Sequence, residues 1–288
     1  MFVSVAIPHY NDVANLTHCL ACLRRQTWPS DFEIVIADNN SSGGVAAVQG
    51  IAPDARVVPA VEQGAGPARN TAAAVASGEV LAFIDSDCLA DENWLTEGIK
   101  ALARHDYVGG RVITAIGDPA RITAAEAYEA VFAFDFKKYI EKQHYSGSGN
   151  LFVPKAVFER VGGFRAGVAE DMEWCWRANA AGYRLGYAEK AIVRHAARCN
   201  WSELKRKHDR MQREELLLAR EQRGWRRRWL LHAALVAASP CVHWLRVLRS
   251  PRLPGVRARF KGLQGLIMIR GYRSYSMVSL LFTGRSAG

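Results

Sequence analysis

Short apolar runs alternate with helical patterns along the first two-thirds of the chain. Three of these runs have the length of buried strands and are followed by turn residues; they cover residues 3–7, 32–37 and 80–84. Between the second and the third run, Pro67 suits the first turn of an Ala-rich helix that ends before Gly78. Strands that alternate with helices predict a parallel sheet covered by helices on both faces.

The same alternation continues to about residue 195. We expect further strands at residues 107–115, 151–153, 185–187 and 191–195. We expect further helices near residues 92–104, 122–140, 155–161 and 169–181. These elements predict an α/β domain at residues 1–198. Ligands of such domains bind beyond the carboxyl ends of the strands, so the polar residues that follow strands are the first candidates for a site.

Residues 199–288 differ in charge and pattern, and we interpret them as a basic helical tail. Residues 194–288 carry 21 Lys and Arg against 5 Asp and Glu, whereas residues 1–193 carry 17 against 23. Ser202 is suited to cap a long charged helix. An apolar stretch at residues 229–248 follows, and it is interrupted by His232, Pro240, His243 and Arg246.

Basic residues interleaved with Trp and Leu are typical of a helix that lies in a membrane interface, and we favour that interpretation for the tail. The apolar stretch is about long enough to cross a bilayer, which needs ~20 residues, but its polar residues argue against a clean span. A soluble helical cap or an oligomer interface is the other alternative. Because the chain begins directly with an apolar strand, we expect a cytoplasmic protein at the inner face of the membrane.

Asp85 and Asp87 directly follow the strand at residues 80–84 and are the sharpest local signal. Two carboxylates one residue apart suit a hard divalent cation, because Mg²⁺ takes one or two protein carboxylates and completes its shell with phosphate oxygens and water. Such a cation would offset charge on a departing diphosphate. A solvated turn without a metal is the alternative for this common pattern.

Two further residues suit a nucleotide. Asp38 follows the strand at residues 32–37, where its carboxylate would accept hydrogen bonds from a base or ribose. Arg69 lies near the start of the helix that Pro67 opens, and a helix N-terminus with an Arg favours an anionic ligand. A surface salt bridge is the alternative for Arg69.

Glu170 and Asp171 begin the helix at residues 169–181. The functional interpretation makes Asp171 a general base that deprotonates an acceptor hydroxyl, with Trp174 and Trp176 beside the acceptor. Acidic residues in a first turn also complement the helix dipole, and a Trp on a helix also packs into a core. His195 follows a strand, where it serves either as a metal or diphosphate ligand or as a structural histidine.

Ordered segments of the chain resemble the family-2 group of inverting glycosyltransferases, which adopt the GT-A fold. The matching segments are residues 3–12, 33–39, 66–70, 78–87, 149–153, 162–164 and 170–171. Their order and spacing cover roughly residues 1–195. The resemblance implies a Rossmann-like, nucleotide-binding mixed sheet flanked by helices.

The resemblance also implies roles for single residues. The donor would contact Pro8, Tyr10, Asp12, Asp38, Arg69, Asp85 and Ser86. Asp87 would be the principal ligand of Mg²⁺ or Mn²⁺, with His195 as a further metal contact. Asp171 would be the catalytic base. Gly149, Asn150, Glu170 and Trp174 would border the sugar and the acceptor.

The implied activity is the transfer of one sugar, with inversion, from a nucleoside-diphosphate sugar such as a UDP- or GDP-sugar. A lipid-linked acceptor in polysaccharide or glycolipid assembly fits a membrane-associated tail. The Q-x-x-R-W signature of processive synthases is absent, which favours single-sugar transfer over polymerisation. The alternatives are a nucleotidyltransferase, which would release pyrophosphate, and a basic nucleic-acid-binding protein. The basic residues avoid the acidic sheet domain, so we expect no nucleic-acid partner.

Overall fold

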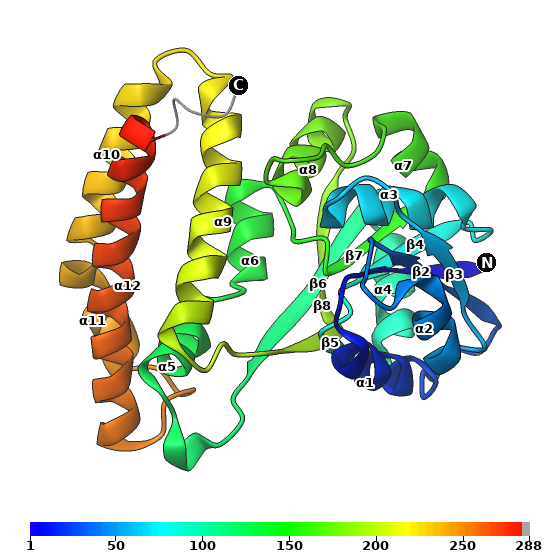
Figure 1. The fold of residues 1–288 in the computed structure, drawn as a ribbon, viewed down its shortest axis with the longest axis horizontal. Helices are drawn as coiled ribbons and strands as arrows, with labels where there is room; N and C mark the ends of the chain where they lie inside the picture. The colour runs from blue at the N-terminus through cyan, green and yellow to red at the C-terminus, as the bar shows by residue number, and fades with distance from the viewer. Residues whose placement is uncertain (284–288) are drawn as a thin grey trace. The chain divides into compact units, whose positions relative to one another are not determined.

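The structure is a computed structural model that describes residues 1–283 (Figure 1). The chain forms two compact units. The first contains Met1–Ile113 and Phe134–His195, and the second contains Thr114–Ala133 together with the chain from Ala196 onward. The sequence predicted a single boundary at residue 198. The structure differs because the apolar residues of 122–131 pack into the core of the helical region.

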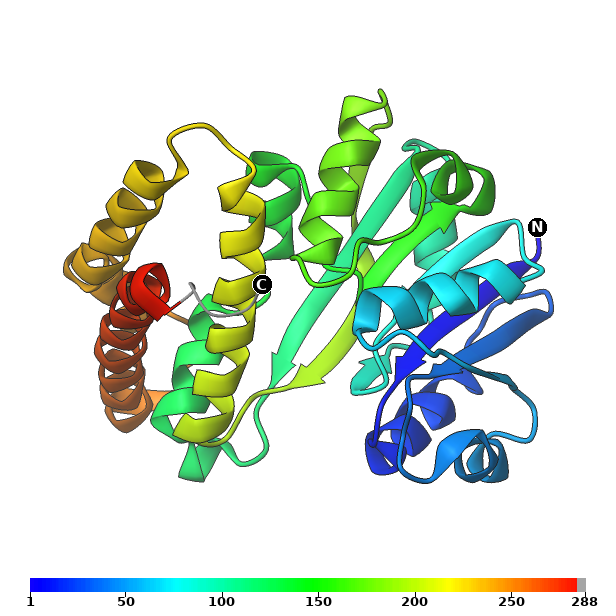
Figure 2. The same cartoon turned by 45° about the horizontal axis from the view of Figure 1, so that its top comes forward.

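Within the described residues, eight strands form one sheet in the order β3-β2-β1-β4-β7-β6-β8-β5. The strands are β1 (Val3–His9), β2 (Phe32–Asp38), β3 (Arg56–Pro59), β4 (Val80–Ile84), β5 (Cys88–Ala90), β6 (Tyr107–Ala115), β7 (Asn150–Pro154) and β8 (Leu185–Ala196). β1 pairs in parallel with β2 and β4, and β2 with β3. β7 is antiparallel to β4 and β6, and β5 is antiparallel to β8. Figure 2 shows the long strands β6 and β8 side by side.

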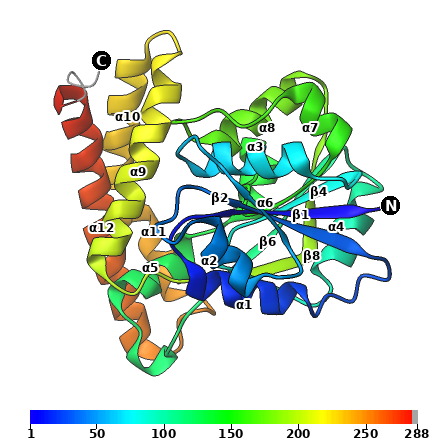
Figure 3. The same ribbon diagram turned by 45° about the vertical axis from the view of Figure 1, so that its right-hand side comes forward.

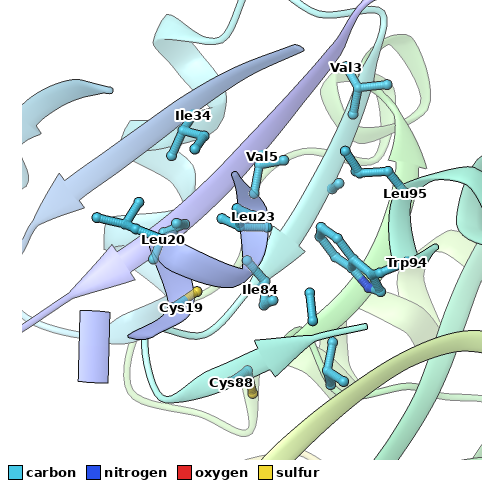
Figure 4. Close-up of a cluster of buried hydrophobic side chains, with 14 of the residues drawn as sticks. Val3, Val5, Cys19, Leu20, Leu23, Ile34, Ile84, Cys88, Trp94 and Leu95 are labelled. Atoms are coloured by element: carbon cyan, nitrogen blue, oxygen red, sulfur yellow. The ribbon is translucent and has the colours of Figure 1, made fainter. Parts of the chain in front are cut away.

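Helices cover both faces of the sheet. One face packs against α1 (Val13–Leu23), α2 (Gly44–Ile51) and α4 (Trp94–Leu102). Figure 4 shows Leu20 and Leu23 of α1 and Trp94 of α4 beside the strand residues of this core. The other face packs against α3 (Ala65–Val75), α7 (Lys155–Val161) and α8 (Glu170–Ala180). Because both faces are covered, all five residues of β4 are buried, which explains the continuous apolar run in the sequence.

The parallel half of the sheet brings three strand ends to one edge. β1 and β2 pair in register, so that His9 lies opposite Asp38. β4 lies on the other side of β1 and ends at Ile84, directly before Asp85. The sequence therefore places Asp38 and the Asp85–Asp87 loop at the same edge, as the βα alternation predicted.

The aromatic segment at residues 122–140 is not one helix, and that prediction was wrong. α5 covers Ala124–Phe132, Phe134 has a φ of 55°, and α6 (Phe136–Lys138) and the π-helical η2 (Tyr139–Gln143) follow. A non-glycine residue in the left-handed region does not continue a right-handed helix, so the chain turns there. The two short strands expected at residues 185–187 and 191–195 are one strand, β8.

The second unit is helical. Besides α5 and the short 3₁₀ helix η1 (Pro119–Arg121), it contains α9 (Trp201–Arg220), α10 (Trp225–Ala238), α11 (Pro240–Leu248) and α12 (Gly255–Thr283). Figure 3 shows α9, α10 and α12 as long helices that run alongside one another. The N-cap of α9 is Asn200, whose side chain accepts the N–H of Glu203 at 2.9 Å, and not Ser202, which lies inside the helix.

The apolar stretch at residues 229–248 is divided between α10 and α11. Pro240 begins α11, and the two helices meet at an angle of 45°. Among the described residues, no single helix is both long and apolar enough to cross a membrane, but α10 and α11 together satisfy the length and composition of a bent span.

Candidate active site

The loop after β4 holds Asp85 and Asp87 in a tight turn. The N–H of Cys88 donates to the carbonyl of Asp85 at 3.0 Å, and β5 begins at Cys88. β5 pairs with β8 so that Cys88 lies opposite His195. This register brings Nε2 of His195 to 3.1 Å from Oδ2 of Asp87. The sequence expected Asp87 and His195 in one metal site, and the structure brings them together.

The residues of this turn suit a divalent cation. The carboxylates of Asp85 and Asp87 and the thiol of Cys88 offer ligand atoms that all lie within 4.8 Å of one another. Both carboxylates are partly exposed, so phosphate oxygens and water can complete the shell. The hard carboxylate oxygens suit Mg²⁺ or Mn²⁺. The thiol of Cys88 does not, because burial raises its pKa and keeps it protonated. The imidazole of His195 packs on the ring of Phe134, with centroids 4.9 Å apart, which fixes its orientation.

Arg69 connects this turn to the start of α8. Its side chain is only 4% exposed, because α3 holds it under the site. Nη2 donates to Oδ1 of Asp85, and Nη1 donates to Oε1 of Glu170 at 3.0 Å. The structure therefore shows Arg69 as a bridge between two carboxylates, whereas the sequence predicted a contact with the donor. The bridge holds the candidate metal turn beside Glu170 and the neighbouring Asp171.

Asp171 has the properties of a general base. Its Oδ1 accepts the N–H of Met172 at 2.8 Å. Burial of its carboxyl group, with a further contribution from the charge of Glu170, raises the pKa of Asp171 to about 6. Arg69 acts in the opposite direction and limits this rise. A carboxylate with this pKa is ionised at neutral pH and accepts a proton more readily than an ordinary aspartate.

A second group of residues forms behind Asp38, and the sequence did not single it out. Nδ1 of His9 lies 3.0 Å from Oδ1 of Asp38, and both side chains are buried. Nε2 of His9 accepts the N–H of Asp12 at 3.2 Å, so Nδ1 carries the proton and donates to Asp38. His9 therefore orients the carboxylate that we expect to contact the nucleotide. The in-register pairing of β1 with β2 is the signal that would have revealed it.

Asn39 fixes the segment that leads into α3. Its amide nitrogen donates to the carbonyls of Ala60 at 2.9 Å and Glu62 at 2.6 Å. Its amide oxygen accepts the N–H of Gly64 at 2.7 Å. Gly64 has a φ of 134°, which favours glycine. The approach to α3, and hence the position of Arg69, depends on this buried side chain.

The other residues predicted to contact the donor lie around the same sheet edge. Tyr10 is 54% exposed, and Pro8 and Ser86 are partly exposed. Asp12 caps α1, since its side chain accepts the N–H of Asn15 at 3.3 Å. These positions leave Pro8, Tyr10 and Ser86 accessible to a ligand, whereas Asp12 has a structural role in the described contacts.

Three residues predicted to border the acceptor are placed differently. Trp174 is fully buried, packs on Tyr107 at 5.3 Å and donates from Nε1 to the carbonyl of Gly162, so its assignment to the acceptor pocket was wrong. Asn150 is also buried, and its described hydrogen bonds link β7 to its neighbours. Gly149 lies directly behind Asp85; a Cβ there would meet Oδ2 at 2.5 Å.

Glu170, the fourth residue predicted to border the acceptor, lies in the candidate site, where it accepts a hydrogen bond from Arg69. Trp176, two residues beyond Trp174, is 39% exposed. The two Trp residues of α8 differ because residues two positions apart in a helix point in different directions.

The sequence and the fold match a known class of enzyme. The family model for glycosyl transferase family 2 matches residues 4–166, more than half of the chain. Glycosyltransferase AglE from Haloferax volcanii is 36% identical over 207 residues, which are 68% of this chain and 67% of AglE. The chain belongs to glycosyl transferase family 2.

Other relatives match this chain over a smaller share of their own length. The pre-mycofactocin glycosyltransferase of Mycobacterium tuberculosis is 26% identical over 208 residues, which are 67% of this chain but 42% of that protein. Among solved structures, the mannosyltransferase PcManGT from Pyrobaculum calidifontis, in complex with GDP-Man and Mn²⁺, covers 99% of this chain and 88% of its own. The TM-score is 0.62 at 19% identity.

A second solved structure supports the same fold. S. aureus TarS 1-349 in complex with UDP-GlcNAc covers 99% of this chain and 92% of its own, with a TM-score of 0.52 at 15% identity. The predicted fold class, a GT-A α/β domain with a helical C-terminal region, is confirmed by these similarities and by the mixed sheet.

Proposed function

We propose that this glycosyltransferase moves a single hexose from a nucleoside-diphosphate sugar to an acceptor hydroxyl, with inversion at the anomeric carbon. One observation carries the proposal: Arg69 joins Asp85, at the candidate metal turn, to Glu170, next to Asp171. The site thus combines carboxylates for a cation that holds a diphosphate with a base of raised pKa.

Mg²⁺ or Mn²⁺, held by Asp87 with Asp85 and His195, would neutralise the charge that develops on the leaving diphosphate. Asp171 takes the proton of the acceptor hydroxyl on Oδ2, because Oδ1 already accepts the N–H of Met172. The hydroxyl oxygen forms its bond to the anomeric carbon as the bond to the diphosphate breaks, and the electron pair leaves with the diphosphate. A single displacement inverts the configuration.

Asp38, held by His9, would contact the base or the ribose of the donor. The similar solved structures contain GDP-Man and UDP-GlcNAc, which supports a UDP- or GDP-sugar as the donor class. His9 donates to Oδ1 of Asp38, and the N–H of Ser41 donates to Oδ2 of Asp38 at 3.3 Å. The two hydrogen bonds hold the carboxylate in one orientation. This arrangement suits recognition of a ribose or base by a fixed acceptor.

The acceptor proposal rests on the helical unit. Its basic excess and the apolar side chains exposed on α10 and α11 support attachment to an anionic membrane surface. We therefore place the enzyme at the inner face of the cytoplasmic membrane, with a lipid-linked acceptor in polysaccharide or glycolipid assembly. Such an attachment would bring an acceptor that is itself held in the membrane to the enzyme.

A thermal-shift screen of nucleoside diphosphates and nucleotide sugars, with and without Mn²⁺ or Mg²⁺, tests the donor site. A ligand that binds the folded state raises the unfolding temperature. We expect a metal-dependent increase with one nucleotide, lost in Asp87→Asn and kept in Asp54→Asn, which removes an exposed carboxylate paired with Arg24. Folded protein that responds to no nucleotide in either metal would contradict the proposal.

A further inference from the structure

The helix α12 exposes apolar side chains along its whole length, in addition to those that it buries. On its inner face, Ala258, Leu266, Ile269 and Met277 are buried against the unit's core. On the outside, a second apolar row is 37–83% exposed; we call it the outer stripe, and it consists of Val256, Phe260, Ile267, Tyr275, Val278 and Phe282. A helix that is apolar on both faces needs an environment for each.

The outer stripe runs along one side of α12, and the exposed residues Gln264 and Gly271 lie between its members. Its members follow at spacings of four, seven, eight, three and four residues, which keeps them on one side of a helix with 3.6 residues per turn. The row extends for roughly 40 Å at 1.5 Å per residue. An exposed apolar surface of this length is unusual on a protein that meets water alone.

Basic side chains lie at both ends of the outer stripe. Near its start, Arg249 and Arg257 are exposed. Near its end, Nε1 of Trp229 donates to the carbonyl of Met277 at 2.8 Å, which brings the start of α10 and the exposed residues Arg226–Arg228 to this part of α12. An apolar row between clusters of Arg is complementary to acyl chains beneath anionic headgroups.

The helix α9 shows why the unit would lie on a membrane and not cross it. α9 contacts α12 through Tyr272, whose hydroxyl donates to Oδ1 of Asp209 at 2.7 Å. On its exposed side α9 carries Arg206, Arg210 and Arg213. α9 thus exposes charged side chains where α12 exposes the apolar outer stripe, and a charged helix side in the acyl layer is costly.

We propose that the outer stripe of α12 is the surface that enters the interface of an anionic bilayer, with the flanking Arg residues on the headgroups. The inference rests on the proposed membrane attachment and assigns it to residues. It adds α12, which lies outside the stretch 229–248 that the sequence singled out, to the exposed apolar side chains of α10 and α11.

Vesicle flotation of the full chain tests the assignment, with vesicles of phosphatidylcholine alone or mixed with phosphatidylglycerol. We expect binding to the mixed vesicles. Phe260→Glu and Ile267→Glu should each weaken binding roughly tenfold or more, and Arg249→Gln by about fivefold. Val61→Glu, at an apolar residue of the sheet unit that is 85% exposed, is the matched control and should bind as the wild type.

The outcomes separate the two proposals. Wild-type protein that binds neither vesicle would contradict the membrane attachment and the stripe together, while donor binding in the thermal-shift screen would be unaffected. Wild-type binding that Phe260→Glu and Ile267→Glu leave unchanged would overturn the stripe alone. A dimer in solution that Ile267→Glu dissociates, without vesicle binding, would identify a second copy of the chain as the partner of the stripe.

Discussion

Nδ1 of His9 donates to Oδ1 of Asp38 across 3.0 Å, and the two side chains are buried at the ends of neighbouring parallel strands. The N–H of Asp12 fixes the tautomer from the other side of the ring. His9 therefore acts as a positioning residue: it orients the carboxylate of Asp38, which we propose contacts the nucleotide.

We predict that His9→Ala raises the donor KM by roughly tenfold and leaves kcat within a few-fold of the wild type. The reason is that the carboxylate of Asp38 loses the N–H that orients it, at a cost of about 1–3 kcal/mol. This loss should weaken binding of the nucleotide sugar more than it slows the chemical step. Steady-state kinetics with varied donor checks this. His18→Ala, at an exposed position of α1, is the control. An equal fall in kcat with unchanged KM would count against the positioning role.

The raised pKa of Asp171 predicts the acidic side of the pH–rate profile. The base works only when it is deprotonated, so kcat/KM should fall as the pH drops through about 6 and reach about a tenth of its plateau one pH unit lower. A profile that stays flat down to pH 4 would show that another group accepts the proton.

The raised pKa of Asp171 also predicts that its ionised carboxylate, although needed for catalysis, lowers the free energy of unfolding. Because the folded-state pKa of Asp171 lies above its ordinary value, ionisation opposes folding, and this contribution is fully present above pH 6. Asp171→Asn should therefore raise the free energy of unfolding at pH 7 by ~1–3 kcal/mol. Urea denaturation at pH 7 and pH 4 measures this; the gain should shrink at pH 4. A destabilised Asn variant at pH 7 would contradict the burial argument.

Arg69 neutralises the carboxylates that face it, and its replacement should affect both stability and the pH profile. Arg69→Met leaves Asp85 and Glu170 without their shared cation, which we expect to cost ~3–5 kcal/mol. It also removes the charge that limits the pKa of Asp171, so the acidic limb of the rate profile should move to higher pH. Arg24→Met, at an exposed ion pair with Asp54, is the control and should change neither quantity appreciably.

A substitution at Gly149 tests whether Asp85 takes part in metal binding. A Cβ at this position would meet Oδ2 of Asp85 at 2.5 Å, so Gly149→Ala must displace that carboxylate. We expect Mn²⁺ binding, measured by calorimetry, to weaken by roughly tenfold or more. Gly50→Ala, in α2 with open space around the new methyl group, should bind Mn²⁺ as the wild type does. Equal affinities in the two variants would remove Asp85 from the metal site.

The sequence predicted the parallel half of the sheet well, because β1, β2 and β4 are buried on both faces and read as continuous apolar runs. It predicted the antiparallel half less well. β5 has three residues, too short for a pattern, yet it is the strand that brings His195 to Asp87. The break at Phe134 also depends on one backbone conformation that composition does not reveal.

In the candidate site, too, some residues could be predicted from the sequence and others could not. Asp85, Asp87 and Asp171 could be proposed because carboxylates after strands or at helix starts are visible in a sequence. The role of Arg69 as a bridge could not, since it depends on the approach of α8, 101 residues away, to α3. Trp174 was misplaced because the helical pattern of α8 does not say which Trp faces the core. Trp176, two residues further along the same helix, is exposed.

The most direct test of the central claim is the release of nucleoside diphosphate from the donor that the binding screen identifies, in the presence of Mn²⁺ and acceptor lipid. We predict metal-dependent release by the wild type and a ~10²–10⁴-fold lower rate in Asp171→Asn, with donor binding retained. Pyrophosphate as the product, or near wild-type turnover in Asp171→Asn, would contradict the proposed glycosyl transfer with Asp171 as its base.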